Sequence, residues 1–158
     1  MFRHICPLSR FDAGLPAAAW AEAWDTLALV SGPEPARSGF EKRLGQILSR
    51  RPGRHLLVRG RPDLPPTDRE HAPTGLTVVP HLATPDLALA LKGAQEIVCR
   101  GGYSTIMDLS ALGILDRRCL FVPTPGQTEQ EYLARHLAET GMGRWTTESE
   151  LERFVGTR

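Results

Sequence analysis

The chain has 158 residues, which is enough for one domain with a single core and short of a two-domain enzyme. Its 19 basic and 18 acidic residues leave a formal net charge of +1, and they form no basic stripe of the kind that binds a phosphate backbone, so we expect no nucleic-acid partner. The three cysteines, Cys6, Cys99 and Cys119, form no C-x-x-C pair. This spacing argues against a disulfide framework or a zinc knuckle and favours buried free thiols.

Short apolar runs alternate with helical patterns along most of the chain. Strands are predicted at 26–31, 55–59, 76–79, 96–99 and 118–122. Helices are predicted at 39–50, 84–92, 104–113 and 128–140, followed by a closing strand near Trp145 and a final helix within 147–155. The proline-rich stretch 60–75 is expected to be an exposed loop. Such alternation is typical of an α/β fold in which helices cover both faces of a mostly parallel sheet.

The first 24 residues differ in composition from the rest, with an alanine-rich stretch that contains Trp20 and Trp24. We therefore expect a linker or amino-terminal extension over 1–24 and a domain over 25–158. The sequence shows no signal peptide and no apolar run near the ~18 residues that a membrane-spanning helix requires. These features favour a cytoplasmic protein.

A strand end, a glycine turn and a helix start follow one another directly after Glu96. The run 96–99 is predicted to be a buried strand, and Gly101 and Gly102 allow tight bending and the close approach of a ligand. The next helix opens with Ser104 and Thr105. Because free backbone N–H groups and the positive end of the helix dipole both point into such a turn, the junction favours an anion and predicts a diphosphate site.

Asp108 lies about one turn further along this helix. A carboxylate does not hold phosphates, but it accepts a pair of hydrogen bonds from vicinal hydroxyls, as a ribose beside a bound diphosphate would supply. The alternative is an ordinary acid on the helix surface. Tyr103 has two interpretations of equal weight: it wedges the turn against the core, or it contacts a ligand.

Three segments resemble the donor-binding domain of GT-B glycosyltransferases. The stretch 100–108 is similar to their nucleotide-binding signature, in which a small turn precedes an aromatic residue, two small polar residues and an acid. The stretch 122–130 resembles the proline-rich strand end and the acidic-Gln pair that these enzymes direct at the donor sugar. The segment Val79-Pro80-His81 resembles the loop that packs against the base, although relatives often carry Gln in place of His81. The likeness is greatest to the bacterial peptidoglycan-precursor N-acetylglucosamine transferase family, over about 26–143.

The resemblance implies a Rossmann-like three-layer α/β/α sandwich that forms the carboxyl-terminal half of a GT-B fold. It also implies transfer of a hexosyl group from a nucleotide diphosphate sugar, a UDP-sugar, to an acceptor hydroxyl. No cofactor is expected, since the nucleotide sugar is a substrate. No metal is expected either, because the five histidines show no metal spacing and the sequence contains no Asp-x-Asp.

The resemblance assigns each segment to one part of the donor. The loop after residue 79 would contact the base, the turn the diphosphate, Asp108 the ribose, and the start of the last long helix the sugar. Arg100, where many relatives carry His or another polar group, would offset charge on the leaving diphosphate, with Arg10 as a second candidate. The full substrate-binding set is Val79, His81, Arg100, Gly101, Gly102, Ser104, Thr105, Asp108, Gln127, Glu129 and Gln130.

A simpler explanation exists for the last of these segments. Thr128 and Glu131 have the spacing of a capping box, and acidic residues such as Glu129 favour a helix start whether or not a ligand is present. Both interpretations remain open at this stage.

The resemblance places the catalytic base and the acceptor site in an amino-terminal half that these residues do not include, so we expect the domain alone to be inactive. That half would be present in cis or in trans, and would provide any peripheral contact with the inner face of the membrane. Two other functions stay open: a nucleotide-sugar epimerase or hydrolase, and a non-catalytic nucleotide-binding subunit. A plain dinucleotide-binding domain is disfavoured because 32–37 lacks the G-x-G-x-x-G spacing.

Overall fold

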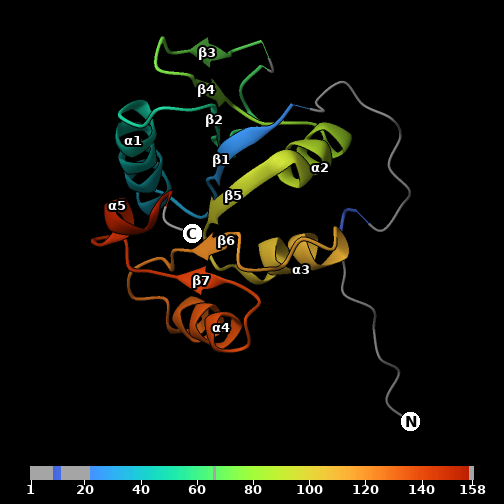
Figure 1. The fold of residues 1–158 in the computed structure, drawn as a ribbon, viewed down its shortest axis with the longest axis vertical. Helices are drawn as coiled ribbons and strands as arrows, with labels where there is room; N and C mark the ends of the chain where they lie inside the picture. Colours follow the sequence, from blue (N-terminus) through green and yellow to red (C-terminus); the bar gives the residue numbers. More distant parts are fainter. Residues whose placement is uncertain (1–8, 12–21, 66, 157–158) are drawn as a thin grey trace.

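Helices and strands alternate along the chain in a computed structural model that describes residues 9–11, 22–65 and 67–156. The elements, in chain order, are β1 (Trp24–Leu29), α1 (Ala36–Ser49), β2 (His55–Val58), β3 (Glu70–His71), β4 (Leu76–Val79), α2 (Thr84–Gly93), β5 (Ala94–Cys99), α3 (Tyr103–Ala111), β6 (Cys119–Phe121), α4 (Thr128–Glu139), β7 (Arg144–Trp145) and α5 (Leu151–Phe154). Figure 1 shows their arrangement in space.

The described strands form one seven-stranded sheet in the order β3-β4-β2-β1-β5-β6-β7. All neighbouring strands run parallel except β3, which pairs antiparallel with β4. From β1 the chain builds outward through β2 to β4, and it then returns to add β5, β6 and β7 on the other side of β1. The order therefore reverses between β1 and β5, and ligands of open parallel sheets bind at the carboxyl edge of such a switch point.

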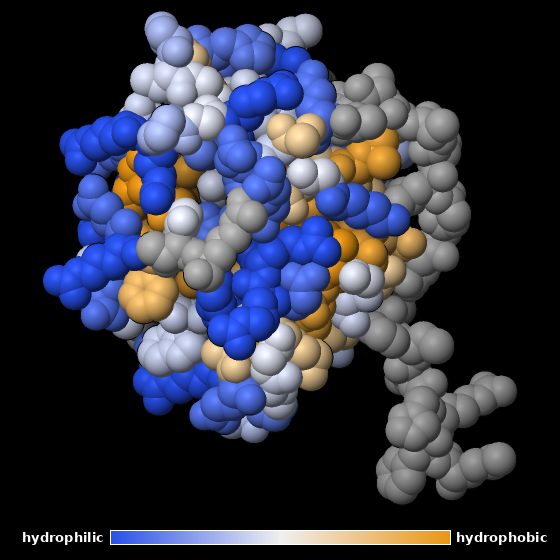
Figure 2. All heavy atoms as spheres, viewed as in Figure 1, coloured by the Kyte–Doolittle hydropathy of each residue, from blue (hydrophilic) through white to orange (hydrophobic). Residues whose placement is uncertain are grey.

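Helices cover both faces of this sheet, as the alternation in the sequence predicts. Helices α1 and α5 lie on one face, and α2, α3 and α4 lie on the other (Figure 1). Successive residues of β5 confirm the two-sided burial, since Ile97 packs toward α2 and α3 and Val98 packs toward α1. The viewed surface is largely polar, with apolar side chains visible only in patches (Figure 2). The predicted three-layer α/β/α sandwich is confirmed.

Two boundaries differ from the prediction. β1 begins at Trp24, whose side chain is 3% exposed in the core and whose backbone pairs with Ala94, so the first strand starts two residues earlier than predicted. The short strand β3 lies within the stretch expected to be a loop, because it pairs with the edge of β4. Phe11 also packs into the core, although it belongs to the expected linker. Most of that linker, including Cys6 and Trp20, lies outside the described residues.

Cys99 and Cys119 are free and buried, as their spacing predicts. Burial raises the pKa of the Cys119 thiol to about 11 and the pKa of Cys99 well above its ordinary value. Both side chains therefore behave as small apolar core residues. None of the helices in the described part of the chain has the length and apolar character needed to cross a membrane.

A buried ion pair closes the amino edge of the sheet. Glu96, at 2% exposure, accepts hydrogen bonds from Arg144 Nη2 at 2.7 Å, from the Gly156 N–H at 2.9 Å and from Thr26 Oγ1 at 3.3 Å. One carboxylate thus joins β5 to β1, to β7 and to the end of the described chain. Removal of its charge takes away the carboxylate that pairs with the Arg144 guanidinium at 2.7 Å.

We expect Glu96→Gln to lower the free energy of unfolding by about 3–5 kcal/mol, since one partner of a buried pair is lost. The matched control is Glu22→Gln, which breaks an ion pair to Arg54 in which both side chains are more than half exposed. That control should cost less than about 1 kcal/mol. Urea unfolding followed by circular dichroism measures both, and equal losses would contradict the assigned role of Glu96.

Candidate functional site

The loops that the sequence singles out all follow parallel strands, so they meet at the carboxyl edge of the sheet. The segment 80–83 follows β4, the turn 100–102 follows β5, and the segment 122–127 follows β6. The loop after β1, 30–35, lies between the first two of these segments. The turn after β5 and the loop after β1 flank the switch point itself.

The glycine turn ends in an uncapped helix start. Gly102 is the N-cap residue of α3, in extended backbone conformation, and among the described residues no side chain caps this end of the helix. The first backbone hydrogen bond runs from the Ile106 N–H to the Gly102 carbonyl at 3.1 Å. The N–H groups of Tyr103, Ser104 and Thr105 therefore have no acceptor within the helix. This arrangement, on a nine-residue helix, is suited to an anion.

The two glycines of the turn have different surroundings. A Cβ on Gly101 would lie 3.4 Å from the carbonyl oxygen of Gln130 and 3.8 Å from Cβ of Ala134, so this side of the turn packs against α4. A Cβ on Gly102 would meet no described atom within 4 Å. The side of the turn at Gly102 is thus open, whereas the side at Gly101 is packed.

Ser104 is exposed and Thr105 is partly exposed, which leaves both hydroxyls near the helix start accessible. Tyr103 is 60% exposed. Its ring does not wedge the turn against the core, so of its two interpretations only contact with solvent or a ligand remains.

Asp108 is buried rather than placed on the helix surface. Its Oδ1 accepts a hydrogen bond from Ser9 Oγ, and its Oδ2 accepts one from Arg10 Nε, each at 2.8 Å. Phe11, the next residue, is buried and donates its N–H to Ser9 Oγ at 3.1 Å. The alternative of an ordinary surface acid is therefore wrong, while the role of Asp108 toward a ribose stays a prediction.

Arg100 occupies a different position from the expected one. Its side chain is 2% exposed, and Nη1 donates hydrogen bonds to the carbonyls of Val122 and Pro123 at 3.2 and 3.1 Å and to the carboxylate of Glu148 at 3.1 Å. Nη2 lies 3.4 Å from the carbonyl oxygen of Ala36. These contacts connect the turn after β5 to the end of β6, to the start of α1 and to the segment before α5.

The guanidinium of Arg100 also stacks on Phe40, with its central carbon 3.8 Å from the ring centroid. Burial lowers the pKa of Arg100, and the neighbouring Glu148 carboxylate opposes that shift. The donors of Arg100 are thus engaged within the fold, and its expected role of offsetting charge on the leaving diphosphate stays a prediction.

Gln130 is fixed across the loop that precedes α4. Its Oε1 accepts a hydrogen bond from the Thr124 N–H at 2.9 Å, and its Nε2 donates one to Gln127 Oε1 at 2.6 Å. Two of the predicted site residues, Gln127 and Gln130, thus hold each other in place. The structure thus orients this amide pair at the carboxyl edge of the sheet, and its binding of sugar hydroxyls stays a prediction.

The predicted capping box at the start of α4 does not form. Helix α4 begins at Thr128, one residue earlier than a box with Thr128 as N-cap would require, and Gln127 is its N-cap residue without a side-chain hydrogen bond. Glu131 instead lines a cavity beside the loop, and Glu129 is exposed. Capping therefore does not explain Thr128 and Glu131.

Val79 and His81 differ in what they present at this edge. Val79 is the last residue of β4, its side chain is buried, and its carbonyl accepts the Arg59 N–H at 2.9 Å. The role of Val79 in base contact stays a prediction, and residues 81–83, which follow it in the loop, are more accessible to a ligand. His81 is partly exposed, with Nδ1 3.2 Å from the carbonyl oxygen of Arg61.

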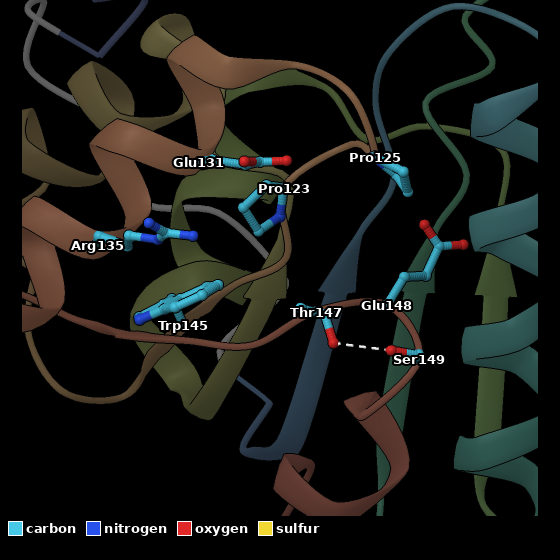
Figure 3. Close-up of a pocket in the computed structure, with 8 residues that line it drawn as sticks. All are labelled: Pro123, Pro125, Glu131, Arg135, Trp145, Thr147, Glu148 and Ser149. Atoms are coloured by element: carbon cyan, nitrogen blue, oxygen red, sulfur yellow. Dashed lines mark hydrogen bonds between the residues drawn. The ribbon is translucent and has the colours of Figure 1, made fainter.

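A cavity of about 300 Å³ lies beside the same edge, between α4 and the connection from β7 to α5 (Figure 3). Its wall includes Arg135, whose guanidinium lies 5.0 Å from the ring centroid of Trp145, and the loop residues Pro123 and Pro125. Figure 3 shows Glu148 extending from the chain before α5 toward Pro125. No local pattern in the sequence relates these residues, because they come from the loop after β6, from α4, from β7 and from the segment before α5.

Comparison with known proteins gives the family. Residues 56–155 match the model of the glycosyltransferase family 28 C-terminal domain. The chain belongs to this family. Among named relatives, one from Nocardia farcinica (strain IFM 10152) is 42% identical over 74 residues, and one from Rhodococcus opacus (strain B4) is 30% identical over 146 residues. Both are called UDP-N-acetylglucosamine--N-acetylmuramyl-(pentapeptide) pyrophosphoryl-undecaprenol N-acetylglucosamine transferase.

These relatives are much longer than the chain. The alignments cover 46% and 90% of the chain but only 18% and 36% of the two relatives. The match of this family 28 domain is therefore to one part of each enzyme.

Solved structures agree with the fold assignment. The family 28 domain superposes on MurG of Acinetobacter baumannii with a TM-score of 0.59 at 23% identity, covering 85% of the chain and 40% of MurG. It also superposes on the glycosyltransferase SnogD from Streptomyces nogalater with a TM-score of 0.59 at 16% identity, covering 90% of the chain and 38% of SnogD. The predicted donor-domain fold of the GT-B class is confirmed.

We expect Arg100→Met to lower the free energy of unfolding by about 3–5 kcal/mol, because Glu148 loses its partner and the bonded carbonyls lose a donor. The matched control is Arg118→Met, which breaks the partly exposed pair with Asp116 and should cost about 1 kcal/mol or less. Thermal and urea unfolding measure both variants. If Arg100→Met lowers the free energy of unfolding by no more than Arg118→Met, the stabilising role assigned to the Arg100 contacts is contradicted.

Proposed function

We propose that the domain binds the donor in a metal-independent glycosyltransferase that moves a hexosyl group from a UDP-sugar to an acceptor hydroxyl. One observation carries the proposal: an open helix start and a buried carboxylate lie about one turn apart on α3, at the switch point of the sheet. Free N–H groups suit a diphosphate, and a carboxylate suits the adjacent ribose hydroxyls. The names of the relatives support a uridine nucleotide and an N-acetylhexosamine as the donor class.

Within this proposal each loop contacts one part of the donor. The segment from Pro80 to Leu82, with His81, faces the base, and the turn with Ser104 and Thr105 holds the diphosphate. Asp108 accepts the ribose hydroxyls. Gln130, together with Gln127 and Glu129, binds sugar hydroxyls, since an amide and a carboxylate offer both donors and acceptors.

The acceptor site and the catalytic base belong, in this proposal, to an amino-terminal half in cis or in trans. The low coverage of the full-length relatives supports this division of labour. The isolated domain then binds the donor weakly and does not turn it over. The same half provides any contact with the inner face of the cytoplasmic membrane, in line with the undecaprenol-linked acceptor in the relatives' name.

Titration with UDP tests the diphosphate site directly. We expect the backbone amide signals of Gly101, Gly102 and Ser104 to shift in ¹H–¹⁵N spectra, because their N–H groups lie at the open helix start. Gly53 and Gly75, beside the amino ends of β2 and β4, serve as internal controls and should not move. Unchanged signals for the turn at millimolar UDP would refute the proposed function.

Substitution of Gly102 separates ligand binding from folding. A Cβ there meets no described atom within 4 Å and the backbone conformation suits alanine, so Gly102→Ala should leave the free energy of unfolding within about 1 kcal/mol of wild type. The added methyl group faces the open side of the turn, and UDP affinity should fall about tenfold.

The matched control is Gly39→Ala in α1, where a Cβ likewise meets no described atom within 4 Å. This substitution lies outside the proposed site and should not change UDP affinity. Equal UDP affinities for Gly102→Ala and Gly39→Ala would place the diphosphate elsewhere.

A further inference from the structure

The hydrogen bonds to the Asp108 carboxylate come from a segment 98 and 99 positions earlier in the chain. Ser9 Oγ donates to Oδ1 and Arg10 Nε donates to Oδ2, each at 2.8 Å. Only 10% of the Asp108 side chain is exposed. Both carboxylate oxygens are therefore engaged by the segment Ser9–Phe11, and the negative charge is compensated by a guanidinium.

The donors of this segment have the pattern of a ribose diol. Two vicinal hydroxyls bind a carboxylate by giving one hydrogen bond to each oxygen. Ser9 and Arg10 do the same, with one donor for each oxygen of Asp108. Only 10% of the Asp108 side chain is exposed. A ribose diol can therefore bind this carboxylate only at the two oxygens to which Ser9 and Arg10 already donate.

The segment is anchored at one end and solvent-accessible at the other. Phe11 is buried in the same core cluster as Ile106 and Leu109 of α3, so it holds the segment on the domain. The Arg10 side chain is 50% exposed, and its charge is readily solvated when it leaves Asp108. Release of the Asp108 carboxylate thus requires the displacement of two side chains, and Phe11 remains in the core.

We infer that Ser9 and Arg10 occupy the ribose-binding position of Asp108 and are exchanged for the two ribose hydroxyls when a donor binds. The inference rests on the proposed function and adds a regulatory element to the same site. The diol replaces hydrogen bonds that already exist, so it contributes little net affinity while the segment is intact. Donor binding is in this way coupled to the position of the chain that precedes the sheet.

The test compares the Kd of UDP with that of 2′,3′-dideoxy-UDP for wild type and for the double variant Ser9→Ala, Arg10→Ala. The ratio of the Kd of dideoxy-UDP to the Kd of UDP reports the contribution of the two ribose hydroxyls, because loss of the Arg10 charge affects both nucleotides alike. We expect dideoxy-UDP to bind within about threefold of UDP in wild type and at least about tenfold more weakly in the double variant, as hydrogen bonds to a free carboxylate become available. Adding Asp108→Asn to the double variant should lower the ratio again.

A spectroscopic readout follows the exchange in the unaltered protein. The Nε–H signal of Arg10 should move to the position of solvated arginines when UDP is added and should stay in place with dideoxy-UDP. An Arg10 signal that does not change at saturating UDP would overturn the inference.

Arg117→Ala, at an exposed arginine after α3, controls for charge and should leave the Kd ratio at its wild-type value. A ratio that stays constant or falls in the double variant would show that the segment does not compete with the diol, and would overturn the inference alone. Failure of UDP to bind either wild type or the double variant would overturn the proposed function as well.

Discussion

The buried guanidinium of Arg100 holds together the segments that meet at the carboxyl edge of the sheet. It donates to carbonyls at the end of β6 and at the start of α1, pairs with Glu148 before α5, and stacks on Phe40. The glycine turn starts at the next residue. Because a buried cation tolerates little displacement from its acceptors, the place of the turn relative to the loop after β6 is fixed by these contacts.

The turn packs against α4, since Gly101 lies beside the carbonyl of Gln130 and the side chain of Ala134. The open helix start, the carboxylate of Asp108 and the amide of Gln130 consequently lie on neighbouring elements of one edge. In the proposed function Asp108 binds the ribose, the helix start binds the diphosphate and Gln130 binds the hexose, which is the order of these groups along a nucleotide sugar. Packing between the turn and α4 sets the positions of these groups, and the groups themselves provide the hydrogen bonds to the donor.

Local patterns in the sequence predicted the alternation of elements, the glycine turn and the start of α3, since each depends on residues close in the chain. The direction of the Arg100 side chain was not predictable, because its acceptors lie on α1, β6 and the segment before α5. The same holds for the contact of Asp108 with Ser9, and for Trp24, whose burial follows from its pairing with β5. The predicted capping box does not form because Thr128 is the first residue of α4 and not its N-cap.

The outermost strands of the sheet, β3 and β7, have two residues each. An edge this short exposes few unpaired backbone groups, so another polypeptide finds almost no template along which to extend the sheet. A protein partner of this domain would then bind to the loops and helices of the domain. Side chains rather than backbone hydrogen bonds would determine the specificity of that interface. Specific pairing is thereby favoured over indiscriminate aggregation.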